Sequence, residues 1–195
     1  TQLVIRRRGG NDYPRPDSDC YFIVGPPRAV LAGFADVSGH APMFPKWSSG
    51  FMVTHWGINE KEMLQNVDLF REKKIPFDTY IIDYDWFNYG KDELGDFEWN
   101  TDNFPDGPSG KLCKDLLASK GVKMAAIRKP RLSSPLPSKT VDEAQAKGWI
   151  LPVPNGAGDK TKEFNFHPQA ARDWWWSQER PLFESGIVGY WNDEA

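Results

Sequence analysis

Three aspartates follow apolar runs of the kind that form buried strands, and they are the side chains best suited to chemistry. Asp83 and Asp85 follow the run at 80–82, and Asp193 ends the run that begins at Ile187. A carboxylate at the C-terminal end of a buried strand is where α/β barrels keep catalytic groups. Retaining glycosidases need a nucleophilic carboxylate and an acid/base carboxyl about 5–5.5 Å apart. Asp193 is therefore a candidate nucleophile for an anomeric carbon, with capping of a following helix as the alternative.

Asp83 and Asp85 are two residues apart, so both would project to the same face if the strand continues through them. Two carboxylates on one face repel each other unless they are solvated, paired or used. One interpretation is that Asp83 accepts hydrogen bonds from sugar hydroxyls, while Asp85 is structural or bound to a neighbouring backbone group. The other is that the two residues cap the loop that follows. The residues alone leave both interpretations open.

Two cations, Arg128 and Lys129, follow the apolar run at 122–127 and are expected at the same rim as the aspartates. Cations near carboxylates favour their charged form, so one or both could hold the aspartates ionised. A salt bridge or a solvated loop is the alternative. No Ser-His-Asp, Cys-His or zinc-ligand spacing is present, so we expect no metal and no cofactor.

The chain is rich in aromatic residues, with nine Trp. The indole face can stack on the C–H face of a sugar ring, and its N–H can donate a hydrogen bond. Core packing is the alternative, and we expect it for most of the nine. Trp174, Trp175 and Trp176 cannot all face one way on a helix, so at least one should pack and another should be partly exposed.

The elements that must position these residues alternate between strands and helices from Trp47 onward. Apolar runs predict four strands, at 51–56, 77–86, 122–127 and 187–191. Four helices are predicted between or before them: one capped by Asn59 with Glu62 three residues on, one from about 112 to Gly121, one from Thr140 to Gly148, and one from Pro168 to about Glu184.

Strands separated by crossover helices predict a parallel sheet that is buried on both faces. A doubly wound sheet is possible, but no G-x-G-x-x-G loop follows any of the strands. Half of an eight-stranded barrel fits better, because every strand ends in polar or aromatic residues that would share one rim. A half barrel would leave open strand edges, so we expect further chain beyond Ala195.

The first 40 residues differ from the rest. Strand-like runs at 3–5 and 21–24 flank a stretch rich in Pro, Asp and Gly, and 27–38 is compatible with a short helix. The net charge of −3 argues against a nucleic-acid binder, and no apolar stretch is long enough to span a membrane. The N-terminus lacks the pattern of a signal peptide, and the sequence assigns neither a compartment nor an oligomeric state.

Six stretches resemble, in order, the signatures of glycoside hydrolase family 31, the α-glucosidase and α-xylosidase group of retaining enzymes. They are Pro45-Lys46-Trp47-Ser48-Ser49-Gly50-Phe51, His55-Trp56-Gly57, Ile75-Pro76-Phe77-Asp78 with Ile82-Asp83-Tyr84-Asp85-Trp86, Phe97-Glu98-Trp99-Asn100 with Phe104-Pro105-Asp106, Phe164-Asn165-Phe166 with Pro168, Trp174 and Trp175, and Gly189-Tyr190-Trp191-Asn192-Asp193. The last matches the family pattern G-F/Y-W-x-D, whose Asp is the nucleophile.

The resemblance implies a (β/α)8 TIM barrel, of which residues 41–195 are about the first four β/α units. Residues 1–40 would be the end of an N-terminal β-sandwich domain and a linker. The family's acid/base Asp lies on a later segment, so the chain as given is expected to be inactive alone. The implied activity is retaining hydrolysis of terminal α-linked sugars in oligosaccharides or glycoconjugates. The alternatives are an α-transglycosylase and a non-catalytic carbohydrate-binding homologue.

The resemblance also implies site residues. Asp193 is the expected nucleophile and Asp83 a sugar-hydroxyl ligand, and the expected walls of the subsite for the cleaved sugar are Trp56, Ile127 and Trp191. We expect Lys129, Arg128 and Asp85 to contact the substrate around them. Two departures from the family pattern, Arg128-Lys129 before a Pro and Glu194-Ala195 after the nucleophile, leave the sugar open. Glucosides, galactosides, N-acetylgalactosaminides, acidic sugars and transfer reactions all remain candidates.

Overall fold

The chain divides into two units, Thr1–Phe44 and Pro45–Ala195. The computed structural model describes residues 2–7, 18–88, 97–133, 139–151 and 161–193. No helix among these residues is long and apolar enough to cross a membrane.

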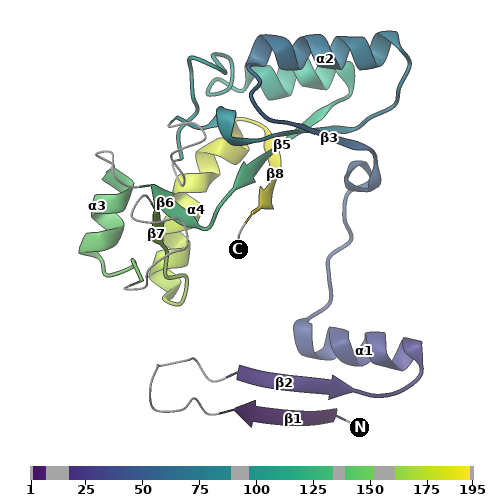
Figure 1. Ribbon diagram of the computed structural model, residues 1–195, viewed down its shortest axis with the longest axis vertical. Helices are drawn as coiled ribbons and strands as arrows, with labels where there is room; N and C mark the ends of the chain where they lie inside the picture. The colour runs from purple at the N-terminus through teal and green to yellow at the C-terminus, as the bar shows by residue number, and fades with distance from the viewer. Residues whose placement is uncertain (1, 8–17, 89–96, 134–138, 152–160, 194–195) are drawn as a thin grey trace. The chain divides into compact units, whose positions relative to one another are not determined.

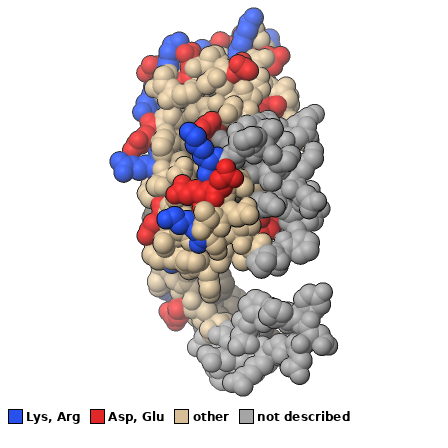
Figure 2. All heavy atoms as spheres, turned by 90° about the vertical axis from the view of Figure 1, so that its left-hand side faces the viewer, with Lys and Arg blue, Asp and Glu red and all other residues tan. Residues whose placement is uncertain are grey.

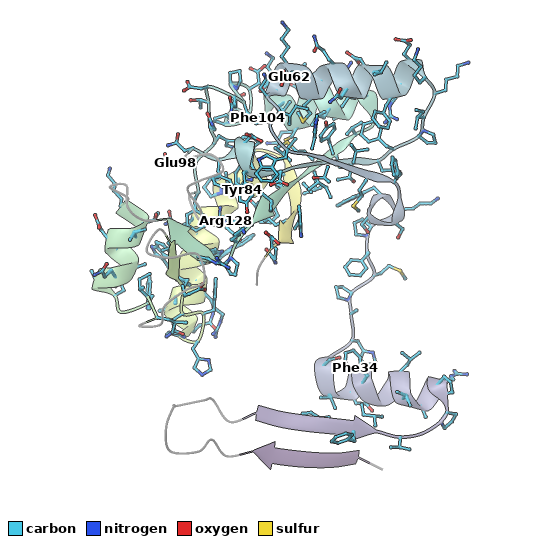
Figure 3. All side chains as sticks on the ribbon, viewed as in Figure 1. Phe34, Glu62, Tyr84, Glu98, Phe104 and Arg128 are labelled. Carbon is cyan, nitrogen blue, oxygen red and sulfur yellow. The ribbon has the colours of Figure 1, made fainter. Side chains whose placement is uncertain are left out.

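The first unit is a hairpin followed by a helix (Figure 1). Strand β1 (Gln2–Arg7) pairs antiparallel with β2 (Ser18–Ile23), and α1 (Pro27–Ser38) follows. The strands and the helix predicted here are confirmed, whereas a β-sandwich around them is not shown. Helix α1 carries exposed apolar residues, among them Leu31 and Phe34, which is labelled in Figure 3.

The second unit is built on a parallel four-stranded sheet in the order β3-β4-β5-β8. All four predicted strands are confirmed. Their bounds are Met52–His55 for β3, Thr79–Ile82 for β4, Lys123–Arg128 for β5 and Ile187–Asn192 for β8. Because all the strands run the same way, their C-terminal ends meet at one edge of the sheet, and Asp83, Lys129 and Asp193 follow these ends along the chain.

Helices connect the strands of this sheet. They are α2 (Glu60–Glu72), the π-helical η4 (Leu112–Leu117) with the 3-10 turn η5 (Ala118–Lys120), α3 (Lys139–Ala146) and α4 (Gln169–Glu184). The predicted start of α2 is confirmed as a capping box, because the Asn59 side chain accepts from the Glu62 N–H and the Glu62 side chain accepts from the Asn59 N–H. Gly121 ends η5 in the left-handed conformation, with φ of 67°.

The helices cover the face of the sheet to which Tyr80, Arg128 and Tyr190 point. The Asn66 amide of α2 donates to the Tyr80 hydroxyl of β4 at 3.2 Å, and the Phe183 ring of α4 lies 5.2 Å from that of Tyr190 in β8. Figure 1 shows α2 on one side of the strands and α4 running beside β8.

The largest fully buried side chains come from these helices, from the strands and from the loops between them. They are Trp86, Tyr80, Phe104, Met63, Ile82, Leu112, Leu117, Met124, Ile127, Leu132, Ile187 and Val67. In the Trp triplet of α4, Trp174 and Trp175 are buried and Trp176 is half-exposed, as predicted. The packing of these buried side chains holds in place the strands that precede Asp83, Lys129 and Asp193.

The structure differs from the prediction after β4. The strand was predicted to continue to Trp86, but it ends at Ile82, and Tyr84–Trp86 form the 3-10 turn η2. The Asp83 carboxylate accepts from the Tyr84 N–H at 2.8 Å, so the first N–H of this turn has a hydrogen-bond partner. The strand therefore does not continue through Asp83 and Asp85, and the condition under which they would share one face is not met.

A second difference is a short antiparallel hairpin after β5, which the sequence analysis did not predict. Strand β6 (Arg131–Ser133) pairs with β7 (Thr161–Glu163). On the face drawn in Figure 2, acidic and basic side chains are interspersed over the described residues rather than gathered in a patch of one sign.

Candidate active site

The candidate site lies at the C-terminal edge of the parallel sheet, where backbone hydrogen bonds continue past the strand ends. The Asp83 N–H donates to the His55 carbonyl at 3.4 Å, and the Asp193 N–H donates to the Arg128 carbonyl at 2.9 Å. Between these pairs, the buried Trp86 indole donates to the Ile127 carbonyl at 2.9 Å. The residues just beyond β3, β4, β5 and β8 are thereby held along one edge.

Asp193 forms an ion pair with Lys129. The Lys129 ammonium lies 3.0 Å from the Asp193 Oδ2 atom, and the Lys129 side chain is only 5% exposed, against 30% for Asp193. The ammonium also lies 5.4 Å from the centre of the Tyr84 ring, within the range of a cation–π contact. A lysine this deeply buried needs a partner of opposite charge, and Asp193 supplies one.

Asp83 belongs to the same electrostatic cluster. Burial raises the pKa of the Asp83 carboxyl, the hydrogen bond from the Tyr84 backbone lowers it, the nearby Asp85 and Asp193 carboxylates raise it, and Lys129 lowers it. The pKa remains above its ordinary value because burial dominates. Two further carboxylates and one ammonium thus act electrostatically on Asp83 at this edge.

Asp85 ties the turn after β4 to the loop after β3. Its Oδ2 atom accepts from the Gly57 backbone N–H at 2.6 Å. Gly57 has a φ of 71°, a conformation that side chains disfavour. This bond fixes the loop next to Trp56, a residue that is 58% exposed and whose ring centre lies 5.6 Å from that of Tyr84. The contact found for Asp85 is thus with backbone, one of the two roles considered for it.

The two cations, expected together at the rim, are separated. Arg128 is 3% exposed and faces α4, where its Nε lies 3.3 Å from the Glu179 Oε1 atom. Its guanidinium also lies 3.9 Å from the centre of the Phe97 ring and 5.3 Å from that of Trp175. Neighbouring residues on a strand point to opposite faces, so Lys129 reaches the acids and Arg128 does not. In this structure Arg128 contacts α4, and its contact with substrate stays a prediction.

The predicted walls of the site differ in what they present. Trp56 and Trp191 are exposed residues, Trp191 to 44%, and an exposed Trp can offer a face for stacking. Ile127 is fully buried, and its carbonyl is taken by the Trp86 indole. Through this carbonyl Ile127 holds the turn after β4, and its place in the wall of the sugar subsite stays a prediction.

The sequence analysis missed Tyr84 and Glu179. Tyr84 stands between two aspartates, and only the change from strand to 3-10 turn brings its ring beside Lys129. Glu179 is one of several charged residues on α4, and nothing in the sequence marks it as the partner of Arg128. Among the described residues, no group of three or more His, Cys, Asp and Glu side chains could hold a metal ion.

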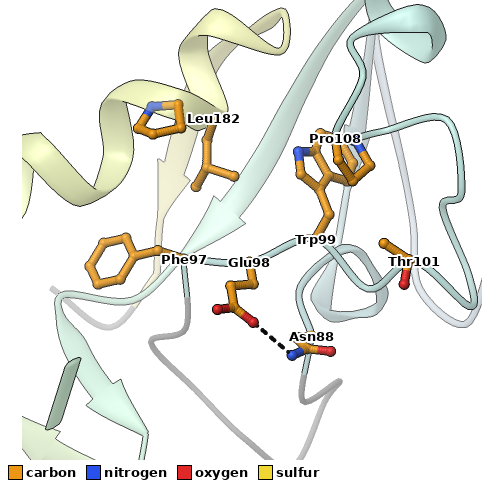
Figure 4. A pocket seen from close by; sticks show the side chains of 8 residues that line it. Asn88, Phe97, Glu98, Trp99, Thr101, Pro108 and Leu182 are labelled. Carbon is orange, nitrogen blue, oxygen red and sulfur yellow. Dashed lines mark hydrogen bonds between the residues drawn. The ribbon is translucent and has the colours of Figure 1, made fainter. Parts of the chain in front are cut away.

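A separate cavity of about 400 Å³ lies where α4 meets the loops after η2 (Figure 4). Phe97, Trp99 and Leu182 form its apolar wall, and the Glu98 carboxylate accepts from the Asn88 amide at 3.0 Å at its rim. None of the carboxylate cluster lines this cavity, so it is distinct from the candidate site.

Comparison with known proteins identifies the family to which this chain is similar. The model described as "Glycosyl hydrolases family 31 TIM-barrel domain" matches residues 41–195. A 1,6-alpha-glucosyltransferase of Sporosarcina globispora is 36% identical over 190 residues, which cover 93% of this chain and 15% of that protein. An alpha-xylosidase of Saccharolobus solfataricus is 28% identical over 173 residues, covering 85% of this chain and 21% of that protein.

Among solved structures, the family 31 dextranase of Flavobacterium johnsoniae, complexed with isomaltotriose, superimposes with a TM-score of 0.75 at 24% identity. The match covers 90% of this chain and 22% of the dextranase. The likeness shows the fold: the sheet β3-β4-β5-β8 and its helices are part of a TIM barrel. The chain spans about a fifth or less of the length of these relatives.

Proposed function

Because this chain belongs to glycoside hydrolase family 31, we propose that the full-length protein carrying it cleaves terminal α-linked sugars through a covalent glycosyl-enzyme intermediate. The observation that carries this proposal is the position of Asp193. It follows the last residue of β8, and Lys129 holds its Oδ2 atom at 3.0 Å. No hydrogen bond to the other carboxylate oxygen, Oδ1, is found among the described residues.

In the first step, Asp193 Oδ1 forms a bond to the anomeric carbon while the glycosidic C–O bond breaks. The departing oxygen takes a proton from a carboxylic acid, which we expect on a later segment of the full-length protein. In the second step, a hydroxyl attacks the anomeric carbon, releases Asp193 as a carboxylate and gives its proton to the acid's conjugate base. Retention follows from two successive inversions.

Other residues of the rim would bind the sugar in the first step. Asp83 is partly buried, and one of its oxygens accepts from the Tyr84 N–H, so its other oxygen is suited to accept from a sugar hydroxyl. The exposed residues Trp56 and Trp191 are suited to stack on sugar rings. These assignments rest on position and chemistry at the rim.

A second candidate is transfer of the sugar to another sugar rather than to water. The observation that favours it is the 36% identity to a 1,6-alpha-glucosyltransferase. The two reactions share the first step and differ only in the attacking hydroxyl. Product analysis with and without an added sugar acceptor separates them, because transfer forms longer oligosaccharides at the expense of free monosaccharide.

Replacement of the nucleophile tests the proposal. In the full-length protein, Asp193→Ala should lower turnover of aryl α-glycosides by about 10⁴-fold or more, because no other group forms the covalent bond. Substrate should still bind, and added azide should restore turnover by giving a glycosyl azide of inverted configuration. The matched control is Asp102→Ala, which removes an exposed carboxylate from a turn and should leave turnover unchanged.

Near-normal turnover of Asp193→Ala would refute the assignment of the nucleophile. A wild-type protein that binds α-glycosides but turns over none of the gluco, xylo, galacto and N-acetylgalactosamino substrates would instead support the non-catalytic homologue.

A further inference from the structure

We propose that Lys129 is a positioning residue that holds Asp193 by its Oδ2 atom and so directs Oδ1 toward the anomeric carbon. This inference rests on the proposed role of Asp193 as nucleophile. It assigns to Lys129 a function that differs from sugar binding, although the residue lies at the rim where sugar ligands are expected.

The sheet itself fixes the distance between the two residues. The Asp193 N–H donates to the carbonyl of Arg128, the residue just before Lys129. Strands β5 and β8 are paired up to Arg128 and Asn192. The backbones of Lys129 and Asp193 are therefore adjacent without any ordering of a loop, and their ion pair forms on a rigid support.

The surroundings of Lys129 also favour this contact. Its side chain is 5% exposed, and an ammonium removed from water requires a close counter-charge. The ring of Tyr84 covers one side at 5.4 Å. A sugar hydroxyl is a neutral acceptor and would compensate the buried charge less well than the Asp193 carboxylate does.

The pair has a chemical consequence in each step. In the first, an oxygen held by Lys129 cannot rotate into the position of attack, so one orientation of the carboxylate is selected. In the glycosyl-enzyme, Oδ2 is the carbonyl oxygen of an ester. A cation beside this oxygen stabilises the negative charge that develops as Asp193 leaves in the second step.

The experiment compares Lys129→Met with Lys123→Met in the full-length protein. Methionine has a similar length without charge, and Lys123 is an exposed residue at the other end of the same strand. For each variant, kcat for an aryl α-glycoside, the inhibition constant of the released monosaccharide and the melting temperature are measured. The fraction of protein present as glycosyl-enzyme is measured by intact mass spectrometry after an acid quench.

For Lys129→Met we expect kcat to fall by about 100-fold, while the inhibition constant of the monosaccharide changes by less than about threefold. The second step should slow more than the first, so glycosyl-enzyme should accumulate with substrates that have good leaving groups. A small alkylammonium ion added to Lys129→Ala should recover part of the lost kcat. Lys123→Met should behave as wild type.

Other results would overturn the inference. An inhibition constant that rises in proportion to the loss of kcat/KM, with kcat unchanged, would make Lys129 a sugar ligand. Wild-type kcat in Lys129→Met would make the ion pair irrelevant to turnover. If Lys129→Met does not fold, the same measurements on Lys129→Arg decide, because Arg keeps the charge but moves the donor: a lowered kcat supports positioning, and an unchanged kcat refutes it.

Failure of this inference is distinguishable from failure of the proposed function. If Asp193→Ala keeps near-normal turnover, the nucleophile is wrong whatever Lys129 does. If Asp193→Ala is inactive and Lys129→Met has wild-type kcat, the nucleophile stands and only the positioning role is lost.

Discussion

Replacement of Glu179 by Gln should destabilise the barrel domain while leaving the chemistry at the rim intact. Glu179 is 14% exposed, and its carboxylate lies 3.3 Å from the guanidinium of Arg128, which is 3% exposed. At that distance the attraction is about 5 kcal/mol for an effective dielectric constant of about 20. Glutamine keeps the shape of the side chain but leaves the Arg128 charge buried without this partner, so the variant isolates the electrostatic contribution.

The net loss is smaller than the attraction, because burial of the carboxylate had a desolvation cost that the variant no longer carries. Breaking a buried pair on one side costs about 3–5 kcal/mol. The contact of Arg128 with the Phe97 ring, at 3.9 Å, remains in the variant and favours the lower end. A loss of about 3 kcal/mol lowers the melting temperature by about 6 °C for a domain of about 250 residues.

The assay is thermal and denaturant unfolding of the full-length protein, with Glu184→Gln as control. Glu184 pairs with Arg180 at 2.8 Å on the same helix, but both side chains are about two-thirds exposed, so its removal should change stability little. The folded Glu179→Gln enzyme should keep its wild-type KM. A melting temperature lowered no more than in the control would refute the reasoning, and with it the assignment of Arg128 to the helix-facing side.

Two further predictions follow from single contacts. Asp85→Ala removes the acceptor of the Gly57 N–H, and a hydrogen bond to a charged group is worth about 2 kcal/mol. The loop at Trp56 should loosen, and KM for aryl α-glycosides should rise by up to about 30-fold. An unchanged KM would show that other contacts hold the loop. Burial raises the pKa of the Cys113 thiol to about 12, so at pH 8 the thiol stays protonated and iodoacetamide should label it only after unfolding, as measured by peptide mass spectrometry; rapid labelling of the folded protein would contradict this.

The parts of the fold that the sequence predicted well are those with a local signal. The capping box of Asn59 and Glu62 marks the start of α2 without reference to the rest of the chain. Strands of a buried parallel sheet are continuous apolar runs, which is why β5 and β8 were located to within about a residue at each end. The common rim then follows from parallel direction alone.

The parts that were missed depend on contacts between distant residues. The alternation of polar and aromatic residues through Asp83 and Asp85 is typical of a strand. In the structure, however, the Trp86 indole donates to the Ile127 carbonyl of the neighbouring strand, and the chain turns at Asp83. The ion pair of Arg128 with Glu179 joins a strand to a helix about 50 residues later in the chain. Strand alternation separates Arg128 from Lys129, but no local pattern reveals which of them faces the acids.

The indole of Trp86 has a consequence for how this scaffold can acquire new specificities. The indole N–H donates to the Ile127 carbonyl of the neighbouring strand. This side-chain hydrogen bond keeps the turn attached to β5, although the backbone has left strand geometry at Asp83. Between the strand end and this anchor, Asp83 still bonds the His55 carbonyl and Asp85 the Gly57 N–H, whereas Tyr84 contacts its neighbours through its ring. Directed evolution aimed at other sugars should therefore vary Tyr84 and leave Asp83, Asp85 and Trp86 unchanged, because these three hold the turn to its neighbours.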